Sequence, residues 1–582
     1  MIVALAVAAV TVASLVVGSL GVRHARTTAN FLVASRAVRP RWNAAAVCGD
    51  TLSAASYLGL AGLVLAAGLD MVWFPVGWAA GFVVMALFVV APLRRFGAYT
   101  IPEFLRDRLD DRRIGRTVAC VIPIIGLIYL LAQLKGAGVV VEALIGAPYW
   151  VGVVAVVVIV VVNLLSGGMR AVTSAQGFQF ILIAVGVLVP VTVLLAVWFA
   201  SDRPGPQDGV PVFDEDSAVT YAAATTVVVD VDTEARVSGT IDGDPYETAV
   251  VLPAGQHDVG SGTTVTWPAG TPVPHETTIT AVSADDWNQV GDAGDTPGGQ
   301  ATYVAYSLLV ASAVGLAGLP HILVRFTTNA TGGQARRTAV IVLGFVAVYY
   351  SALPIYGALG RQVAPDLLST GGTDSVMLVV PQRIVGGTPG ELLVAIVAVG
   401  AVAAFLSTAA GVMIASAGAL SHDLLGGGIR WFPHATIAAG AVAIPLGLLV
   451  ESVDISILVG WSTAIAASSI TPVLLLSLWW PGLTATGALA SIVVGTTTAT
   501  LAVLASVTGL SQRSTPWLDT LLAAPAAWTV PLAVVTAVVV SRRSGRPVAG
   551  VERMFARMHV PDRLRPESGP AAPVVGHPRT AR

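Results

Sequence analysis

Charged residues are scarce in this sequence, lysine is almost absent, and there are only two cysteines. Charged residues make up 11% of the 582 positions and hydrophobic residues 55%, whereas a soluble protein carries about 25% charged residues. This balance excludes an ordinary soluble protein and predicts an all-α polytopic membrane protein. Cys48 and Cys120 lie in apolar stretches, which argues against a disulfide framework. Of the 32 basic residues only Lys135 is a lysine, so arginine carries nearly all the positive charge.

The signatures of catalysis and of cofactor binding are also missing from the sequence. The eight histidines are scattered, and no His/Cys set has the spacing of metal ligands. No glycine loop precedes a Lys-Ser/Thr pair, and there is no nucleophile elbow. His321 and His422 lie at predicted helix ends, where capping or packing explains them. We therefore expect neither an enzyme, nor an organic cofactor, nor a nucleic-acid partner.

Long apolar runs occupy most of the chain. A helix needs roughly 20 apolar residues to cross a bilayer, and by that measure the sequence predicts about thirteen spans. The first run is followed, not preceded, by basic residues, so it is interpreted as a retained helix and not as a signal peptide. The predicted spans lie near 2–22, 43–66, 71–93, 117–142, 149–166, 174–199, 301–324, 338–359, 391–420, 435–450, 455–479, 484–509 and 525–540.

Arginine clusters follow the first, third, seventh and thirteenth predicted spans. Because cytoplasmic loops carry an excess of basic residues, these odd-numbered exits predict that the N-terminus is outside and the C-terminus inside. The clusters are Arg23, Arg26, Arg36, Arg39 and Arg41, then Arg94, Arg95, Arg106, Arg108, Arg112, Arg113 and Arg116, then Arg325, Arg336 and Arg337, and finally Arg542, Arg543 and Arg546.

The insert at 200–300 falls on the predicted external side and differs from the rest of the chain. It holds 17 acidic residues and two arginines. Its β-branched runs, separated by Gly, Pro and Asp, indicate a small β-rich external domain; a solvated acidic loop is the alternative. The tail at 541–582 has nine arginines against three acidic residues, and we expect it to lie in the cytoplasm against anionic lipid.

The span at 43–66 is long enough to cross a bilayer, yet its centre is polar. An intramembrane carboxylate usually faces a protein interior or a water-filled path, and a broken helix at membrane depth exposes backbone oxygens to ions. Close packing of small residues between helices is the alternative. Gly49 and Leu52 are therefore candidates to bind a cation through their carbonyl groups. The other polar candidates in the segment are Asp50, Thr51, Ser53 and Ser56.

A second polar patch lies in the predicted span at 391–420. Helical spacing places Ala404, Ser407 and Thr408 on one face, where two hydroxyls lie beside a carbonyl. Hard oxygen ligands of this kind suit an alkali cation better than a soft metal. The alternative is that both hydroxyls bond to their own helix.

Gln133 and Lys135 lie well inside the predicted span at 117–142. A buried ammonium needs a partner or loses its proton. Lys135 is expected to pair with Asp50, to bind an anionic substrate or to replace a second cation; snorkelling to the membrane surface is the alternative.

Four motifs in this chain resemble those of the sodium:solute symporters, and within that family those of the cation/acetate symporter branch. The resemblance runs over about 31–559, interrupted by the external insert. The motifs are 49–59, 167–171 together with Gln176, 318–326, and 407–424. Two features depart from the family pattern, namely the insert at 200–300 and the charge of Lys135.

The resemblance implies a LeuT-type core of two inverted five-helix repeats, with a principal sodium site at Gly49, Leu52, Ala404, Ser407 and Thr408. It divides the chain into an N-terminal helix and loop (1–42), a first repeat (43–199), the insert (200–300), a second repeat (301–479), two peripheral helices (480–540) and the tail (541–582).

The resemblance also implies a symporter in the plasma (inner) membrane that imports a short monocarboxylate, such as acetate, propionate or pyruvate, driven by Na⁺ or H⁺. A carrier of an amino acid, a sugar or another small solute is the first alternative, and a transport-like sensor or channel is the second. The expected partners are the solute, the coupling cation and the bilayer; the oligomeric state stays open. The candidate substrate ligands are Thr51, Ser53, Ser56, Gln133, Lys135, Tyr306 and Ser307.

Overall fold

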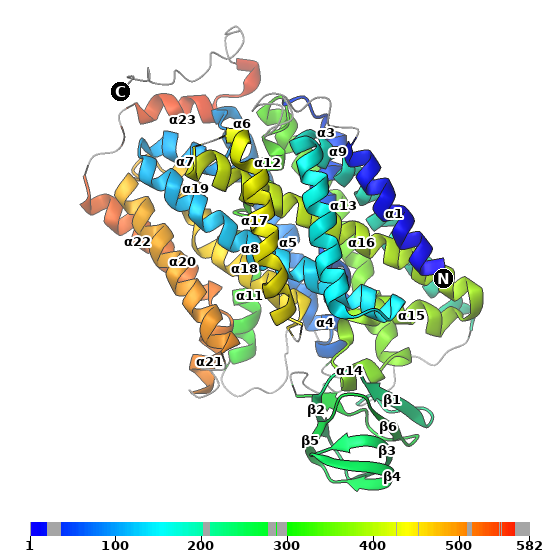
Figure 1. The fold of residues 1–582 in the computed structure, drawn as a ribbon. Helices are drawn as coiled ribbons and strands as arrows, with labels where there is room; N and C mark the ends of the chain where they lie inside the picture. Colours follow the sequence, from blue (N-terminus) through cyan, green and yellow to red (C-terminus); the bar gives the residue numbers. More distant parts are fainter. Residues whose placement is uncertain are drawn as a thin grey trace.

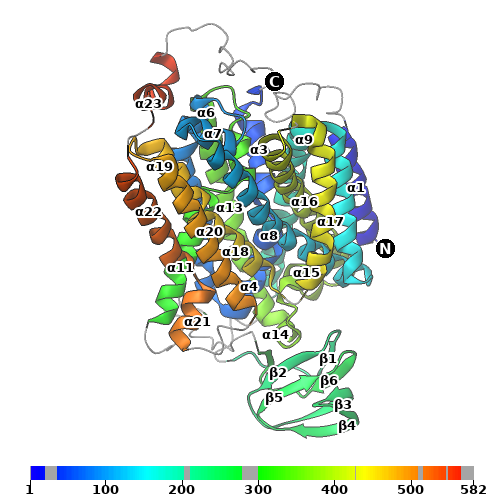
Figure 2. The same ribbon diagram turned by 60° about the vertical axis from the view of Figure 1, so that its left-hand side comes forward.

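A bundle of long apolar helices forms most of the molecule, and a small β-domain projects from one end of it (Figure 1 and Figure 2). The computed structural model describes residues 2–19, 36–201, 210–277, 287, 299–426, 428–451, 453–508, 515–545, 548 and 550–564. The predicted basic residues Arg23, Arg26 and Arg546, and the tail beyond 564, lie outside the described residues.

Within these ranges, nine helices are long and apolar enough to cross a membrane, and the number rises to as many as eleven if each of two bent helix pairs is one span. Two shorter apolar helices, Ile2–Gly18 and Tyr149–Leu165, correspond in position to the first and fifth predicted spans. The chain is therefore a helical polytopic membrane protein.

The helices follow one another along the chain with short connections. The part before the β-domain contains α1 (Ile2–Ser19), α3 (Pro40–Thr51), η3 (Ala55–Gly59), α4 (Leu60–Ala67), η4 (Leu69–Val72), α5 (Trp73–Val84), η5 (Met85–Val89), α6 (Val90–Phe96), α7 (Ile101–Leu109), α8 (Arg112–Ile145) and α9 (Tyr149–Ala200). The part after it contains α11 (Gln300–Leu316), α12 (Pro320–Phe326), α13 (Gly332–Val363), α14 (Asp366–Thr370), η6 (Thr373–Ser375), α15 (Val376–Val385), α16 (Gly387–Gly418), η7 (Ala419–Leu424), η8 (Gly428–Trp431), α17 (Phe432–Leu449), α18 (Ile455–Ser468), α19 (Ile470–Trp479), α20 (Ala485–Val507), α21 (Pro516–Ala523), α22 (Ala526–Arg543), α23 (Val551–His559) and η10 (Asp562–Leu564).

Two apolar helices are broken inside the bundle. Between α3 and η3–α4 the axis bends by 73°, and Leu52 leaves the helical region with φ −75° and ψ 78°. Between α11 and α12 the axis bends by 43° at residues 317–319. Gly318 in that second break has no room for a side chain, because a Cβ there would lie 2.0 Å from Thr471 Oγ1.

Helix α16 crosses the centre of the bundle and packs tightly against α9. A Cβ on Gly186 would lie 2.8 Å from the Cα of Gly400, so only glycine permits this approach of the two backbones. Tyr57 of η3 fills the adjoining space, and its hydroxyl donates a hydrogen bond of 2.9 Å to the Val397 carbonyl. The broken helix is thus anchored to the α16–α9 pair.

One end of the bundle, here named the arginine-rich face, carries α6, α7 and α23 (Figure 1). The Arg95 guanidinium donates to Asp562 across 3.2 Å, and the other oxygen of that carboxylate accepts a 3.0 Å bond from the Gly333 amide. These contacts hold the segment after α23 against the end of α6 and the start of α13.

The β-domain lies at the opposite end, here named the β-domain face, and is a seven-stranded antiparallel sheet. The strand order is β1-β6-β3-β5-β2-β7, with β4 paired to β3, and Tyr221 and Trp267 are buried in its core. The strands are β1 (Ser217–Tyr221), β2 (Thr225–Val229), β3 (Thr233–Ile241), β4 (Asp244–Leu252), β5 (Gly255–Val259), β6 (Thr263–Trp267) and β7 (His275–Glu276).

Candidate functional site

The break after α3 removes two carbonyl groups from the ordinary helical hydrogen-bond ladder. In an α-helix the Gly49 carbonyl would accept from the Ser53 amide, but that amide donates to the Thr51 carbonyl at 2.8 Å. The Ala54 amide, the helical donor to the Asp50 carbonyl, instead donates to Gln133 Oε1 at 2.9 Å. Gln133 is held in place by its own 3.2 Å bond to the Tyr129 carbonyl. Gln133 therefore stabilises the break itself.

The polar face of α16 lies against the freed carbonyls. The Thr408 hydroxyl donates to the Asp50 carbonyl at 2.9 Å, which ties α16 to the break. Ser407 Oγ is fully buried and has no hydrogen-bond partner among the described residues. A Cβ on Gly49 would lie 3.0 Å from that oxygen and 2.5 Å from the Gln176 carbonyl oxygen, so Gly49 faces Ser407 directly.

These buried oxygens are uncharged hard ligands. The structure brings Gly49, Ser407 and Thr408 together; Leu52 lies at the break and Ala404 one turn before Thr408 on α16, both fully buried. Unwound backbone carbonyls with neighbouring hydroxyls are the type of ligand set that coordinates Na⁺ in broken-helix transporters. A cation bound here would contact the broken helix and α16 at once.

The hydroxyls predicted to hold the solute are all buried near the break. Thr51 Oγ1 donates to the Val47 carbonyl at 2.8 Å, and Ser56 Oγ donates to the Ser53 carbonyl at 3.0 Å. Ser53 lies beside the Tyr129 hydroxyl. The Thr51 and Ser56 hydroxyls already donate their protons to backbone carbonyls. Their oxygens can still accept a hydrogen bond from another donor.

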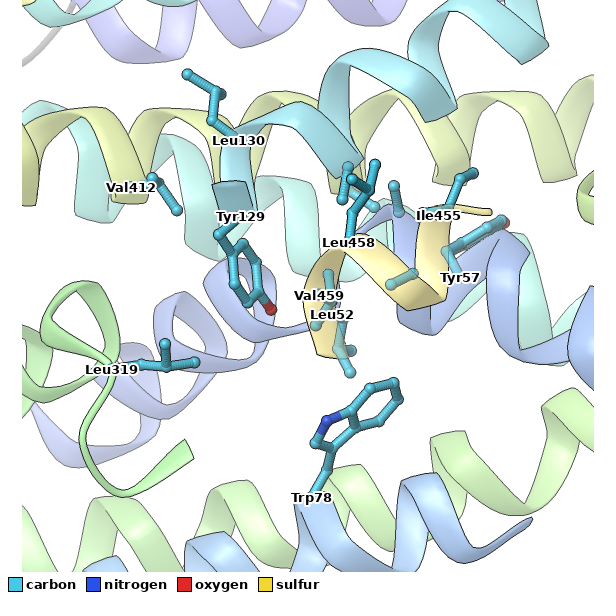
Figure 3. Packing of buried hydrophobic residues seen from close by; sticks show 14 of the residues in the cluster. Leu52, Tyr57, Trp78, Tyr129, Leu130, Leu319, Val412, Ile455, Leu458 and Val459 are labelled. Atoms are coloured by element: carbon cyan, nitrogen blue, oxygen red, sulfur yellow. The ribbon is translucent and has the colours of Figure 1, made fainter. Parts of the chain in front are cut away.

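Aromatic side chains surround this segment, and the sequence pattern did not indicate them. The rings of Trp78 and Tyr350 lie 5.4 Å apart, and Tyr350 also contacts Tyr349 at 5.6 Å. Tyr129 packs 4.9 Å from the His321 ring. Figure 3 shows Tyr129 and Trp78 pointing toward the region of Leu52 from two different helices. Trp78, Tyr129 and Tyr350 are all buried, so the segment around the break is lined by aromatic rings as well as hydroxyls.

Three predicted substrate ligands are placed elsewhere. Tyr306 is 64% exposed, and the Ser307 hydroxyl donates to the Ala524 carbonyl at 2.6 Å, because this face of α11 is directed toward α22 and the outside of the bundle. The Lys135 ammonium donates to the Glu451 carbonyl at the β-domain end of α17. The expected pairing of Lys135 with Asp50 is therefore wrong.

Asp50 instead forms an ion pair with Arg325, which lies on α12 in the second broken helix. The Arg325 Nε to Asp50 Oδ2 distance is 3.0 Å, and both side chains are fully buried. Arg325 also donates to Thr173 Oγ1 at 3.2 Å and contacts Met169 Sδ at 2.9 Å, both on α9. The pair connects the two broken helices on the arginine-rich side of the cation-site candidate.

A polar network extends this connection toward the arginine-rich face. The Asn43 amide donates to the Arg325 carbonyl at 3.0 Å and to Asn329 Oδ1 at 2.9 Å. Thr328 returns a 3.1 Å bond to Asn43 Oδ1. In the sequence, Arg325 stands out only as a loop charge and as part of a motif. The signal that points to its role is that a carboxylate inside the membrane needs a partner.

Comparison with known proteins gives a family match. The model described as "SSF: Sodium:solute symporter family" matches residues 31–202 and 277–495, which is more than half of the chain and omits the β-domain. Ninety-eight solved chains resemble this one significantly.

Among the similar solved structures is the substrate-bound, outward-open state of a Na⁺-coupled sialic acid symporter, with a TM-score of 0.62 and 12% identity, covering 94% of this chain and 98% of that one. Two others are Mhp1, a nucleobase-cation-symport-1 family transporter (TM-score 0.48, 13% identity, 90% and 97% coverage), and a manganese transporter from Eremococcus coleocola (TM-score 0.48, 13% identity, 87% and 95% coverage). The first of these shows the same fold.

The buried ion pair gives a stability prediction. We expect Asp50→Asn alone, or Arg325→Gln alone, to destabilise the protein by about 3–5 kcal/mol, because each leaves one charge buried without its partner. The double substitution is expected to recover a large part of that loss. Thermal unfolding in detergent measures both effects.

The control is the partly exposed pair of Asp366 and Arg383, where Asp366→Asn is expected to cost less than about 1 kcal/mol. Single Asp50 and Arg325 variants as stable as the wild type would show that the pair is not an internal clamp.

Proposed function

The chain belongs to the sodium:solute symporter family, and on that basis we propose that it is a Na⁺-coupled symporter importing a short-chain monocarboxylate of the acetate, propionate or pyruvate type. As a member of the family it is a solute transporter and not an enzyme. The proposed location is the plasma membrane, with the arginine-rich face in the cytoplasm.

The observation that carries the cation part of the proposal is the buried Ser407 hydroxyl oxygen. It lacks a hydrogen-bond partner among the described residues and faces Gly49, whose carbonyl has lost its helical donor. A buried unpaired oxygen costs free energy, and a bound cation removes that cost. The proposed Na⁺ ligands are Gly49, Leu52, Ala404, Ser407 and Thr408.

Na⁺ at this position would couple binding to shape. Because the ligands come from both the break and α16, an occupied site would fix the η3–α4 half-helix relative to α16. The solute pocket shares that half-helix, so cation binding would complete the pocket. Because of this linkage, the protein would transport the solute poorly when no cation is bound.

The solute part of the proposal rests on the start of the η3–α4 half-helix. Residues 55–67 are continuously helical, and the positive end of a helix attracts a carboxylate. Ser53 and Thr51 lie at this end, and Trp78, Tyr129 and Tyr350 enclose it. A short monocarboxylate bound here would place its charge at the helix end and its apolar tail against these rings.

The two breaks also support the proposed repeat arrangement. α3–α4 would begin a first five-helix repeat that ends with α9, and α11–α12 would begin a second that ends with α19. In this arrangement the two breaks would lie in corresponding helices of the two repeats, which is where inverted-repeat carriers place their binding sites.

Uptake into proteoliposomes tests the solute and the coupling ion together. With a Na⁺ gradient imposed at equal pH on both sides, labelled acetate is expected to accumulate above its external concentration. A pH gradient without Na⁺ is expected to give no accumulation. Propionate and pyruvate in tenfold excess should suppress the signal, whereas glucose and alanine should not.

Acetate that only equilibrates under the Na⁺ gradient would reject the proposal and favour a channel. Suppression by alanine or glucose, without suppression by propionate, would assign the carrier to a different solute.

Removing one hydroxyl tests the cation site. Ser407→Ala is expected to raise the Na⁺ concentration for half-maximal uptake by about tenfold, which corresponds to the loss of roughly 1.4 kcal/mol from one ligand. The measurement is uptake as a function of external Na⁺ at saturating solute.

The matched control is Thr436→Ala on α17, which removes a buried hydroxyl whose hydrogen bond, within the described part of the chain, goes to the Phe432 carbonyl of its own helix. Its Na⁺ dependence should equal that of the wild type. An unchanged Na⁺ dependence in Ser407→Ala would remove this residue from the site.

A further inference from the structure

A second charged cluster lies at the β-domain end of the bundle, away from the proposed cation and solute sites. It contains Lys135 of α8, Asp374 of η6 and Asp454, which immediately precedes α18. The Lys135 ammonium donates to the Glu451 carbonyl and lies within electrostatic range of both carboxylates, without forming a direct ion pair with either of them. An Asp374 oxygen accepts a 3.4 Å bond from the Ile455 amide at the start of α18.

Asp374 belongs to a hairpin formed by α14, η6 and α15, here named the gate hairpin (366–385). The hairpin tip packs against the second half of the broken helix, because a Cβ on Gly62 would lie 2.8–2.9 Å from the backbone of Thr373 and Asp374. The tip also contacts α8 and η3. The cluster therefore joins the gate hairpin to α8 and α18, beside the second half of the broken helix.

The β-domain is attached to the same hairpin. The Ser369 hydroxyl donates to the Pro274 carbonyl at 2.7 Å, and a Cβ on Gly371 would lie 2.8 Å from Glu276 Oε2. Trp287 of the insert donates to the Leu65 carbonyl at the end of α4, at 3.4 Å. The insert thus contacts both the gate hairpin and the broken helix, and Glu276 adds a further negative charge near Asp454.

The charges of the cluster do not balance when both aspartates are ionised. One ammonium faces the carboxylates of Asp374 and Asp454, with Glu276 nearby from β7. Two other carboxylates, those of Glu451 and Glu142, lie near the Tyr149 hydroxyl. Asp366 forms an ion pair with Arg383. Burial raises the pKa of Asp374, and burial together with the Asp374 carboxylate raises the pKa of Asp454 to about 7, against the lowering effect of Lys135.

We propose that Lys135, Asp374 and Asp454 form a proton-binding site that holds the gate hairpin closed over the pocket on the β-domain face. One proton shared by the two aspartates neutralises the cluster and allows the hairpin, α8 and α18 to stay together. Loss of that proton leaves an excess negative charge, and repulsion between the carboxylates releases the hairpin. The site explains the lysine inside α8 without giving it a role in solute binding.

The direction of the pH effect follows from linkage. A carboxyl group whose pKa is raised in the closed arrangement binds its proton more tightly there than in the open, hydrated one. The closed arrangement is therefore fully favoured below the ordinary carboxyl pKa of about 4 and loses stability as the pH rises toward about 7. Alkaline pH at the β-domain face should open the gate, and acid pH should close it.

A reporter cysteine measures this opening without any solute, so the result is independent of the solute proposed above. Val459, on α18 below Asp454, is 1% exposed and points toward the region of Leu52 (Figure 3). Val459→Cys in the full-length protein is labelled from outside in right-side-out vesicles with a membrane-impermeant methanethiosulfonate. Labelling of the reporter-free protein is subtracted. The rate is normalised to Thr248→Cys on the exposed face of β4, which corrects for thiol ionisation.

The normalised rate is expected to rise at least about threefold from pH 5.5 to pH 8. Asp454→Asn and Asp374→Asn, each added to the reporter, should reduce this change to less than about 1.5-fold because the titrating group is gone. Lys135→Met should move the rise to higher pH, because the carboxylates then hold their proton more tightly. Asp366→Asn, on the same hairpin but in the separate Arg383 pair, should keep the original profile.

A flat profile with the cluster intact would overturn the proposal. So would an unchanged profile in Asp454→Asn and Asp374→Asn. If one aspartate variant does not fold, the other variant and Lys135→Met decide the question by the same measurement.

Discussion

The break at Leu52 is the constraint on which the rest of the transport site depends. A transmembrane helix must satisfy its own backbone groups, so a break in the bundle persists only where other groups replace the lost hydrogen bonds. Here the Gln133 side chain accepts a hydrogen bond from the Ala54 amide, and the Thr408 hydroxyl donates one to the Asp50 carbonyl. These two bonds come from α8 and α16, which places both helices at the break and brings Ser407 opposite Gly49.

Two charged clusters lie on either side of this break and differ in kind. The Asp50–Arg325 pair is fully buried and connects the two broken helices toward the arginine-rich face. The cluster of Lys135, Asp374 and Asp454 joins the gate hairpin to α8 and α18 toward the β-domain face. The first is a balanced pair, and the second carries one carboxylate too many. Because a single proton changes the net charge of the unbalanced cluster, it is the easier of the two to switch by pH.

The break and the α16 face were accessible from the sequence because both are polar interruptions of apolar runs. Composition and span lengths led to the helical membrane fold, and β-branched runs indicated the strands that form between 217 and 276. Partners across the bundle were not accessible in the same way. Arg325 is 275 residues from Asp50, and the rotation of α11 that turns Tyr306 outward is set by packing against several helices. The groups around the Lys135 ammonium, namely the Glu451 carbonyl and the carboxylates of Asp374 and Asp454, lie between the long helices. Hydrophobic periodicity does not predict the conformation of such connecting segments.

The central claim is that a cation binds between the broken helix and α16, and equilibrium binding of radioactive Na⁺ to the solute-free purified protein tests it most directly. Saturable binding is expected in the wild type and in Gly344→Ala, where a Cβ meets nothing within 4 Å. Gly49→Ala is expected to lose at least about tenfold in affinity, because its Cβ would displace the Gln176 backbone from 2.5 Å and disturb the ligand oxygens. Equal Na⁺ binding by Gly49→Ala and the wild type, or no saturable binding by either, would contradict the account.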